Sequence, residues 1–332
     1  MPFRAIAGHR PVLELLARAT ARGTLPPSLI FAGPEGVGKR RTATALAQAL
    51  NCDSPIESDG GRDACGACAP CKRIARGVHA DVLVIEPGET GSIKIEQVRE
   101  AIDRSSYRPF EGRRRLVVVD GADALVDVAQ EALLKTLEEP PPASVFVLIT
   151  SRPDILLPTV RSRCQRLRFG PLSAADVADV LMRDHGVDAA EAHAAAAAAD
   201  GSVGRALAGS AEDANEARDA AARLLQSAAT SNDPRRRLDG AKALVAGGGD
   251  RDEVSRRLLA LSSLVRDLGL LHSRGDDRAL ANVDLRPALQ ALLRSYDADR
   301  TIRAFDTVDR ALSAIDRNAS PKIVADWLAL NL

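Results

Sequence analysis

The chain lacks a net charge, lacks a long apolar run, and has few cysteines. Lys plus Arg and Asp plus Glu both number 45 among 332 residues, so the chain alone has no electrostatic reason to bind a polyanion tightly. No opening run joins basic residues to a long apolar segment, which argues against a secretory signal or membrane span. We therefore expect a cytoplasmic protein whose nucleic-acid contacts, if any, are local or shared with partners.

The length instead favours two or three folded domains, and the first 170 residues alternate apolar runs with helical patterns. Several of the runs are nearly continuous in Val, Ile and Leu, as expected of parallel strands covered on both faces. The sequence therefore predicts an α/β domain with a mainly parallel sheet over residues 1–170. The expected strands are SLIFAG from Ser28, DVLVIEP from Asp81, RLVVVDG from Arg115, SVFVLIT from Ser144 and RCQRLRF from Arg163.

Beyond Phe169 the strand signal stops and helical patterns continue to the last residue. Ser173 and Asp176 have nearly the spacing of a capping box and predict a helix start. Residues 171–210 read as a small helical domain and 211–332 as a larger one. The expected breaks in the larger one lie at Pro234, at 247–249, at 272–277 and at Pro321.

The stretch FAGPEGVGKR, from Phe31 to Arg40, is almost a nucleotide-binding loop. Its glycines follow an expected strand and precede an expected helix, so backbone N–H groups would converge on a phosphate and Lys39 would add a charge. The next position should carry Ser or Thr to hold Mg²⁺, but it is Arg40. Thr42 is a poor substitute, since two residues turn a helix by about 200°. The alternative is a glycine-rich turn without a ligand.

A second acidic element has lost a residue as well. LVVVDGAD ends a strand at Asp120, which could reach a metal through water or steady the loop. Gly121 stands where an ATPase of this design commonly has Glu to activate water, and Asp123 lies too far along to replace it. A strand followed by a glycine turn is an alternative explanation of LVVVDGAD. However, the phosphate loop and this acidic motif have each lost an expected residue, at Arg40 and at Gly121, which favours a degenerate ATPase site. Nucleotide binding can survive such losses better than Mg²⁺-assisted hydrolysis.

Four of the five cysteines crowd into residues 52–71 with metal-ligand spacing. They form C-x12-C-x2-C-x2-C in a segment rich in Gly, Ala and Pro that could not build a core of its own. Four thiolates leave no open position on a metal, so the sequence predicts a structural zinc site. An iron–sulfur cluster remains the alternative, because four thiolates serve both. The predicted ligands are Cys52, Cys65, Cys68 and Cys71.

Together these elements resemble the bacterial clamp-loader ATPases, AAA+ proteins of the DNA polymerase III holoenzyme. The resemblance rests on the phosphate loop, the cysteine segment, ALLKTLEEPPP (132–142), SRPDILLPTVRSRCQRLRF (151–169) and the closing SPKIVADWLALNL. It is dense over the first 210 residues and thin beyond them. The departures at Arg40 and Gly121 make the chain most similar to delta-prime subunits and less similar to the tau/gamma motor subunit.

The resemblance implies roles for particular residues. Arg163, in Ser162-Arg163-Cys164, would be an arginine finger acting in the ATP site of a neighbouring subunit. Arg205 would face nucleotide from a helical lid, and Thr150 would touch the terminal phosphate. Alternatively, Arg205 forms only a local ion pair, and Thr150 is an ordinary β-branched residue at the end of a strand. His9 falls near the segment that contacts adenine. The implied nucleotide site comprises Gly33, Gly36, Gly38, Lys39, Arg40, Asp120, Thr150 and Arg205.

The resemblance also implies an architecture and partners. Residues 1–170 would form the AAA+ domain, 171–210 a lid, and 211–332 a collar that joins a hetero-pentameric ring with tau/gamma and delta subunits. That ring would load a sliding clamp onto primed DNA. Within it, this chain would bind zinc as a structural metal and would be a weak or inactive ATPase, with ATP and Mg²⁺ as possible but not firmly expected ligands. An active motor remains one alternative. A stand-alone nucleic-acid-binding protein is another, although CGACAPCKRIARG offers few cations and no aromatic for stacking.

Overall fold

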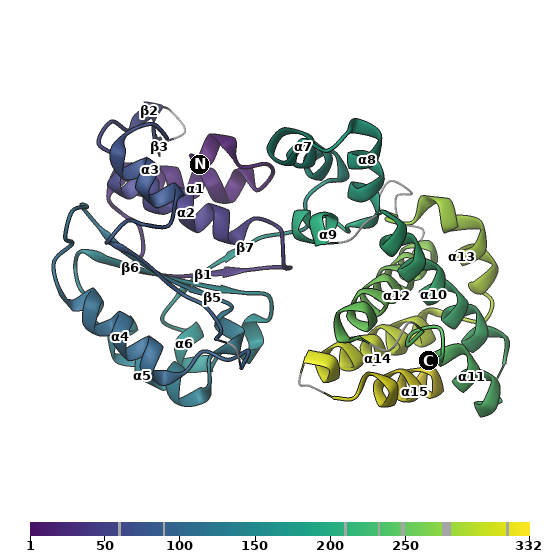
Figure 1. Ribbon diagram of the computed structural model, residues 1–332. Coiled ribbons are helices and arrows are strands. Elements are labelled where there is room, and N and C mark those ends of the chain that lie inside the picture. Colours follow the sequence, from purple (N-terminus) through teal and green to yellow (C-terminus); the bar gives the residue numbers. More distant parts are fainter. Residues whose placement is uncertain are drawn as a thin grey trace. The chain divides into compact units, whose positions relative to one another are not determined.

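A computed structural model describes residues 1–332 except 59, 60, 89, 209, 210, 232, 247–249, 274–279, 317 and 318. The chain divides into two compact units (Figure 1), one of Met1–Val180 with Gly201–Gly204 and one of Leu181–Asp200 with Arg205–Leu332. The division into domains at 170 and 210 stays a prediction. No helix in the described part of the chain is long and apolar enough to cross a membrane.

The first unit is built on a five-stranded parallel sheet, which confirms the predicted fold class. The strand order is β4-β5-β6-β1-β7, and every neighbouring pair is parallel. All five predicted strands form, although several are shorter than their apolar runs. Their bounds are β1 Ser28–Ala32, β4 Val82–Ile85, β5 Arg115–Asp120, β6 Ser144–Thr150 and β7 Gln165–Arg168.

Helices cover both faces of this sheet, as its continuous apolar strands require. Successive side chains of a strand point to opposite faces, so Leu29 and Phe31 join one core while Ile30 and Ala32 join the other. Figure 1 shows one face under α1 Arg10–Arg22, α2 Lys39–Asn51 and α3 Ala69–Ala75. The opposite face lies against α4 Ile95–Ser106, α5 Asp127–Glu138 and α6 Pro158–Arg161. Short 3₁₀ turns are η1 Phe3–Ala5, η2 Ala122–Ala124 and η3 Pro153–Ile155.

A small antiparallel hairpin precedes the cysteine loop and was not predicted. It pairs β2 Ile56–Ser58 with β3 Gly61–Asp63. Three-residue strands carry too few alternations to be distinguished from a loop in the sequence. The hairpin is held from outside, because the Phe3 backbone N–H donates to Asp63 at 2.8 Å.

The remainder of the chain is helical, as predicted. Ser173 accepts a hydrogen bond from the Asp176 backbone N–H at 3.1 Å, which confirms the predicted helix start, and helices begin at Pro234 and Pro321. Helix α12 ends at His272, where the break at 272–277 is predicted. The rest of that break, 274–277, and the predicted break at 247–249 lie outside the described residues. The second unit buries one large apolar core. The helices are α7 Ala174–His185, α8 Ala189–Ala198, α9 Val203–Ala208, α10 Ala211–Thr230, α11 Pro234–Ala241, α12 Arg251–His272, η5 Val283–Leu285, α13 Arg286–Leu292, α14 Ala298–Asp316 and α15 Pro321–Asn331.

Candidate functional site

The carboxyl ends of the parallel strands bring the predicted nucleotide residues of the first unit to one edge of the sheet. The phosphate loop follows β1, Asp120 ends β5 and Thr150 ends β6. Since β1, β6 and β5 are neighbours in the sheet, these side chains meet at the position where open α/β sheets bind ligands. Gly36 and Gly38 have φ of 70° and 102°, backbone conformations that favour glycine.

The interior of the phosphate loop is filled by the side chain of Lys39. Its ammonium donates to the backbone carbonyls of Gly33 and Pro34, at 2.5 and 2.6 Å. Only 6% of Lys39 is exposed, and burial lowers the pKa of its ammonium. The loop carbonyls therefore hold the cation that the sequence predicts for the outer phosphates.

A segment distant in the sequence but in the same compact unit lies on the loop. The Ser202 hydroxyl donates to the Glu35 carbonyl at 2.8 Å, and the Gly204 N–H donates to the Gly36 carbonyl at 3.2 Å. A Cβ on Gly36 would lie 2.2 Å from the Ser202 Oγ. Glycine is therefore required at this position for close approach as well as for its backbone conformation.

Arg40 pairs with the acidic residues to which a bound metal would be drawn. Its Nη1 lies 3.1 Å from the Asp120 Oδ2 and also contacts the Glu86 carboxylate. Burial raises the pKa of Asp120, and the guanidinium of Arg40 opposes that rise. A guanidinium is always charged, so the protein's own cation neutralises this acidic pair.

The other predicted phosphate-side residues are also engaged within the protein. The Thr42 hydroxyl donates to the Gly38 carbonyl at 3.0 Å, in keeping with its expected inability to replace the missing Ser or Thr. The buried Thr150 hydroxyl donates to Asp123 at 2.9 Å. Gly121 forms a turn with φ of 79°. The residues that could orient water or metal are thus tied to one another.

The two arginines with predicted roles, Arg163 and Arg205, each form an ion pair within the chain. Arg163 forms an ion pair with Glu138, and its Nη1 donates to the Thr159 carbonyl at 2.8 Å. Arg205 lies in the second unit, 3.7 Å from Asp200. Both arginines would have to exchange a partner within the chain for a phosphate.

His9 takes a place beside the phosphate loop. Its Nε2 lies 2.8 Å from the Val37 carbonyl, and its ring stands edge-on to that of Phe169 at 4.9 Å. His9 also has a positive φ of 51° just before α1. The contact fixes the ring against the loop.

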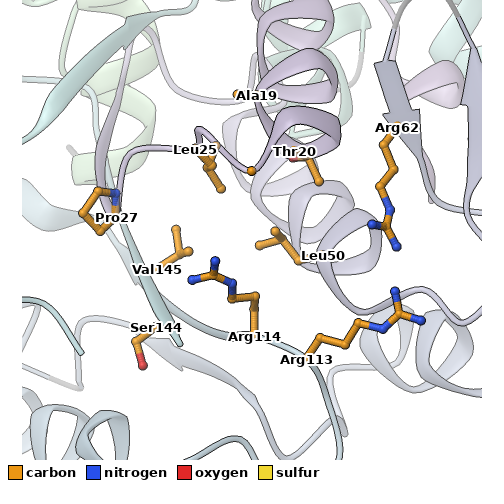
Figure 2. Close-up of a pocket in the computed structure, with 11 residues that line it drawn as sticks. Ala19, Thr20, Leu25, Pro27, Leu50, Arg62, Arg113, Arg114, Ser144 and Val145 are labelled. Carbon is orange, nitrogen blue, oxygen red and sulfur yellow. The ribbon is translucent and has the colours of Figure 1, made fainter. Parts of the chain in front are cut away.

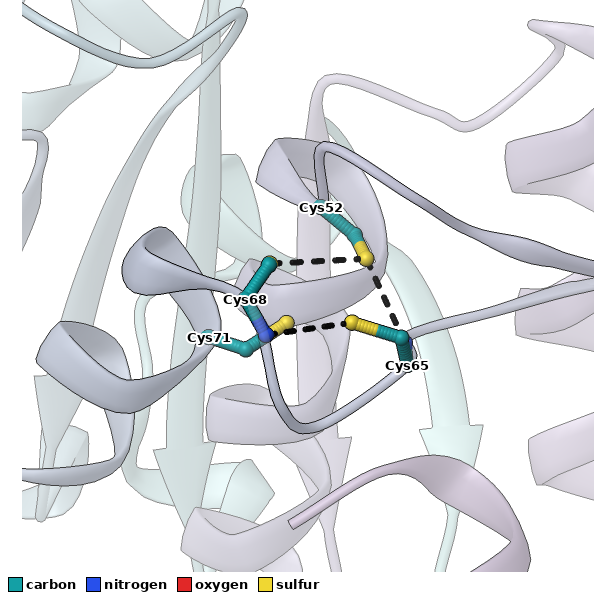
Figure 3. Close-up of side chains that lie close together, drawn as sticks. All are labelled: Cys52, Cys65, Cys68 and Cys71. Carbon is teal, nitrogen blue, oxygen red and sulfur yellow. Dashed lines mark hydrogen bonds between the residues drawn. The ribbon is translucent and has the colours of Figure 1, made fainter.

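The four cysteines converge as their spacing predicts (Figure 3). Their sulfur atoms all lie within 4.8 Å of one another, and the Sγ atoms of Cys52 and Cys68 are 3.8 Å apart. Four sulfurs at about 2.3 Å from a central zinc lie roughly 3.8 Å apart in a tetrahedron. The donor set therefore fits a four-coordinate metal of this size.

The environment of the cysteines also suits a thiolate-bound metal. Backbone N–H groups of Ala67 and Cys68 donate to Cys65 and lower its pKa to about 6. Burial instead raises the pKa values of Cys52 and Cys71. Two thiols are thus buried where a charge is costly, and a cation among them would remove that cost.

Helix α2 and the chain's first residue anchor this cluster. The Gln48 side chain donates to the Cys71 carbonyl at 2.7 Å, and the Met1 ammonium donates to Gln48 at 2.7 Å. Cys52 follows the last residue of α2. The cysteine loop is therefore attached to the helix that begins in the phosphate loop.

Sequence reasoning missed three partners of the site: Glu86, Ser202 and Glu138. The position of Glu86 could have been predicted from the strand pairing. Ile85 pairs with Val119 in the parallel register, so Glu86 must fall beside Asp120 once β4 and β5 are known neighbours. Ser202 and Glu138 gave no such signal, because their contacts cross loops whose paths the strand pattern does not define.

The sheet order β4-β5-β6-β1-β7, with a glycine-rich loop after β1 and an acidic strand end on β5, on the other side of β6, defines a P-loop domain of the AAA+ type. The family described as "DNA polymerase III, delta subunit" matches residues 8–173, half of the 332 residues. The chain belongs to this family.

Individual relatives match the same part of the chain. The DNA polymerase III subunit tau of Salmonella typhimurium is 35% identical over 178 residues, which cover 54% of this chain and 26% of that protein. The subunit delta' of Bacillus subtilis is 35% identical over 171 residues, or 52% and 50% of the two chains. This chain thus matches half or less of the length of these relatives. A gamma subunit-related structure from Thermotoga maritima covers 98% of both chains at 19% identity and a TM-score of 0.40.

Proposed function

We propose that this chain is a delta-prime-like subunit of a bacterial DNA polymerase III clamp loader. In this role it supports ATP-driven loading of the sliding clamp onto primed DNA and lends Arg163 to a neighbouring ATPase subunit. Its own phosphate loop is a weak or inactive ATPase site. Its partners are the tau/gamma and delta-type subunits of a hetero-pentameric ring, the sliding clamp, and primed DNA reached through the assembled complex.

The ion pair between Arg40 and Asp120 is the observation that carries this proposal. In a working site a Ser or Thr hydroxyl and an acidic strand end share Mg²⁺. Here Arg40 stands in place of the hydroxyl residue and forms an ion pair with Asp120, and Glu86 pairs with the same guanidinium. Mg²⁺ would have to displace a covalently attached cation before it could reach Asp120.

The neighbouring subunit's ATP site is where Arg163 acts in this proposal. A guanidinium can bind phosphate oxygens in a bidentate way and stabilise charge that develops on them. In a loader reassembled with Arg163→Ala, turnover at that one site should fall by about 10³-fold or more, while the complex still assembles. Unchanged turnover would remove Arg163 from this role.

Two further variants sharpen the Arg163 experiment. Arg161→Ala is the matched control, because Arg161 is a nearby arginine that pairs with Asp154 at 2.7 Å. It should leave turnover unchanged. Glu138→Gln removes the carboxylate that holds Arg163 within its own chain. It should retain full stimulated turnover, since the finger needs only the neighbour's phosphate.

The four cysteines hold a structural zinc ion in this proposal. The convergence of their sulfur atoms supports it, and four ligands leave no position for a substrate. Metal analysis of the purified chain should find about one zinc per chain and no visible absorbance. A brown protein containing iron would instead identify an iron–sulfur cluster.

An active motor of the tau/gamma type is the second candidate. Its support is the 35% identity with the tau subunit of Salmonella typhimurium over 178 residues. This candidate requires Mg²⁺ to be held although Arg40 pairs with Asp120. It predicts steady ATP turnover by the isolated chain, which the delta-prime-like role does not. Lys39, Thr150 and Arg205 would then serve their predicted roles around bound nucleotide, together with Gly33, Gly36 and Gly38.

A further inference from the structure

A cavity lies at the opposite edge of the sheet from the phosphate loop (Figure 2). It has a volume of about 220 Å³ and opens where β1 and β6 begin. This is smaller than the roughly 300–1,000 Å³ of sites for drug-sized ligands. Its walls are partly apolar and its polar lining is basic. The lining residues that carry the argument are Thr20, Leu50, Arg62, Arg113, Arg114 and Val145.

Three arginines from two separate segments reach this cavity. Arg62 belongs to β3, whereas Arg113 and Arg114 precede β5. None of the described lining residues carries a carboxylate. Of the three, only Arg62 has an ion pair among the described residues, a long one of 3.8 Å to Glu57. The three guanidinium groups repel one another, and a bound anion would reduce that repulsion.

Two polar groups in the cavity have unmet hydrogen-bonding capacity. Thr20 is only 9% exposed, and its hydroxyl has no hydrogen-bond partner among the described residues. The buried Nε of Arg62 likewise has no hydrogen bond there, and its nearest carboxylate oxygen, on Glu57, is 3.8 Å away. A buried polar group without a partner is costly. Both groups therefore suit an acceptor that enters from outside.

The arginines are not needed to neutralise the end of helix α1, which also borders the cavity. The carbonyl of Ala19 accepts from the Thr24 N–H at 3.0 Å, and that of Thr20 accepts from the Gly23 N–H at 3.4 Å. This C-terminal turn thus satisfies its own acceptors. The helix end therefore does not take up the positive charge of the cavity, although the Arg114 Nη1 already donates to the Pro142 carbonyl.

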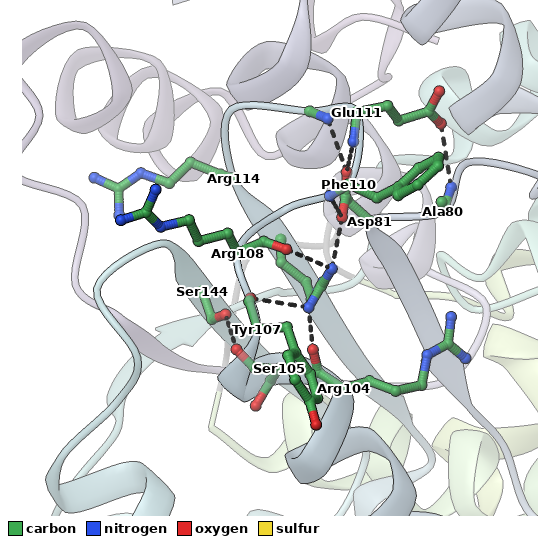
Figure 4. Close-up of polar contacts among 12 residues, drawn as sticks. Ala80, Asp81, Arg104, Ser105, Tyr107, Arg108, Phe110, Glu111, Arg114 and Ser144 are labelled. Atoms are coloured by element: carbon green, nitrogen blue, oxygen red, sulfur yellow. Dashed lines mark hydrogen bonds and ion pairs between the residues drawn. The ribbon is translucent and has the colours of Figure 1, made fainter.

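A rigid loop presents Arg113 and Arg114. Their backbone N–H groups both donate to the Asn51 Oδ1, at 2.8 and 3.0 Å. Just before them, the loop wraps the buried Asp81 carboxylate, which also pairs with Arg115 at 2.9 Å (Figure 4). A Cβ on Gly112 would lie 2.5 Å from the Asn51 Oδ1. The loop can therefore hold its cations in place before a ligand arrives.

We propose that this cavity is a binding site for a phosphate group. A tetrahedral phosphate has enough acceptor oxygens to satisfy several arginines and the Thr20 hydroxyl together, whereas a carboxylate has only two oxygens. Guanidinium groups match phosphate oxygens in bidentate geometry. Free phosphate compounds and the backbone of a nucleic acid share this chemistry.

Isothermal titration calorimetry with inorganic phosphate, on the full chain in a phosphate-free buffer, tests the site. Arg113→Gln and Thr20→Val should each weaken phosphate binding by about tenfold or more, the loss expected for one hydrogen bond to a charged group. Thr20→Val should not lower the melting temperature, because it removes an unpaired buried hydroxyl and keeps the shape. A folded Thr20→Val protein with unchanged phosphate affinity would contradict the proposal.

Two further variants separate this cavity from the rest of the protein. Arg18→Gln removes an arginine of α1 that pairs with Glu14 outside the cavity, and it should leave binding unchanged. Lys39→Ala should also leave it unchanged. If Lys39→Ala abolishes binding while Arg113→Gln does not, the ion binds in the phosphate loop and the proposal fails. It fails equally if the unaltered chain binds no phosphate.

A short oligothymidylate identifies the source of the phosphate group. If it competes with inorganic phosphate, and Arg113→Gln and Thr20→Val weaken it in parallel, the cavity takes a nucleic-acid backbone phosphate. If it does not compete while inorganic phosphate binds through Arg113 and Thr20, the ligand is a small phosphate compound. Either result upholds the site.

Discussion

Helix α2 connects two places where the sequence predicts a bound cation, and the protein treats them differently. At its first residues, Lys39 and Arg40 supply positive charge from the chain itself to the loop carbonyls and to Asp120. Just after its last residue, Cys52 joins three other thiols, and the four sulfur atoms lie within 4.8 Å of one another. At the first end of the helix, side chains of the protein itself supply the positive charge. At the other end, four thiols form a ligand set that fits a metal ion.

At the phosphate-loop end, cations of the chain itself lie beside the loop carbonyls and Asp120. A cradle for phosphate and Mg²⁺ brings backbone dipoles, carboxylates and a lysine close together. If that ligand is given up, the carboxylates need another cation, and Arg40 supplies one beside Asp120 and Glu86. In the proposed function, no side chain takes the place of the metal among the four thiols. The stability of the cysteine segment therefore depends on a bound metal.

The largest expected effect comes from the cysteine end. Cys68→Ser should release the metal and lower the free energy of unfolding by several kcal/mol, since metal binding to a structural site is folding free energy. Metal analysis and denaturant unfolding measure the two quantities. Cys164→Ala is the matched control, because this buried cysteine lies outside the cluster. It should keep about one zinc per chain, and a Cys68→Ser protein of unchanged stability would contradict a structural role.

The next effect concerns the loop that contacts Asn51, at the same end of α2. Asp81→Asn breaks a buried ion pair with Arg115 and should cost about 3–5 kcal/mol. Although burial acts to raise it, the pKa of Asp81 is held below 3.8 by backbone N–H groups and Arg115. Its contribution is therefore present above pH 3.8 and lost as pH falls through the lowered pKa. Unfolding measured against pH should show a shallower acid loss in Asp81→Asn, and an identical profile would contradict this assignment.

A smaller effect is expected at the phosphate-loop end. Arg40→Thr restores a hydroxyl at the metal-ligand position and releases Asp120. Mg²⁺-dependent affinity for ATP should rise by about tenfold, the equivalent of one hydrogen bond to a charged group. Fluorescent-nucleotide titration with and without Mg²⁺ measures it, and Arg41→Thr controls for the loss of charge alone. An unchanged affinity would mean that Arg40 is not what excludes the metal.

The smallest effect tests what holds the loop closed. Ser202→Ala removes the hydroxyl that donates to the Glu35 carbonyl and should cost about 1 kcal/mol in urea unfolding. Ser106→Ala, at an exposed serine of α4, should cost less. If both variants cost the same, the segment 201–204 does not stabilise the loop.

Much of this arrangement could be predicted from the sequence because its signals are local. The five strands show as apolar runs, and the glycines before Lys39 mark a turn into a helix. Cys65, Cys68 and Cys71 lie within seven consecutive residues, from a loop into the first turn of α3, so their spacing alone places their sulfur atoms close together. In each case the residues that define the feature are neighbours in sequence, or alternate on a strand.

The contacts that decide the chemistry could not be predicted in the same way. The sequence shows that Arg40 replaces the expected Mg²⁺ ligand, but its pairing with Glu86 depends on which strands are neighbours. Arg163 was assigned from a motif, and its ion pair with Glu138 depends on how α5 and the turn before β7 pack. The predicted roles of Thr150 and Arg205 stay predictions, since each requires a phosphate as its partner.

Mg²⁺-dependent ATP turnover by the purified chain alone tests the central claim most directly. We expect no turnover above that of a Lys39→Ala variant, because Arg40 occupies the acidic pair and Gly121 offers no base. Clear turnover that Lys39→Ala abolishes would contradict the account. It would mean that Mg²⁺ is held in another way and that the chain is itself a motor.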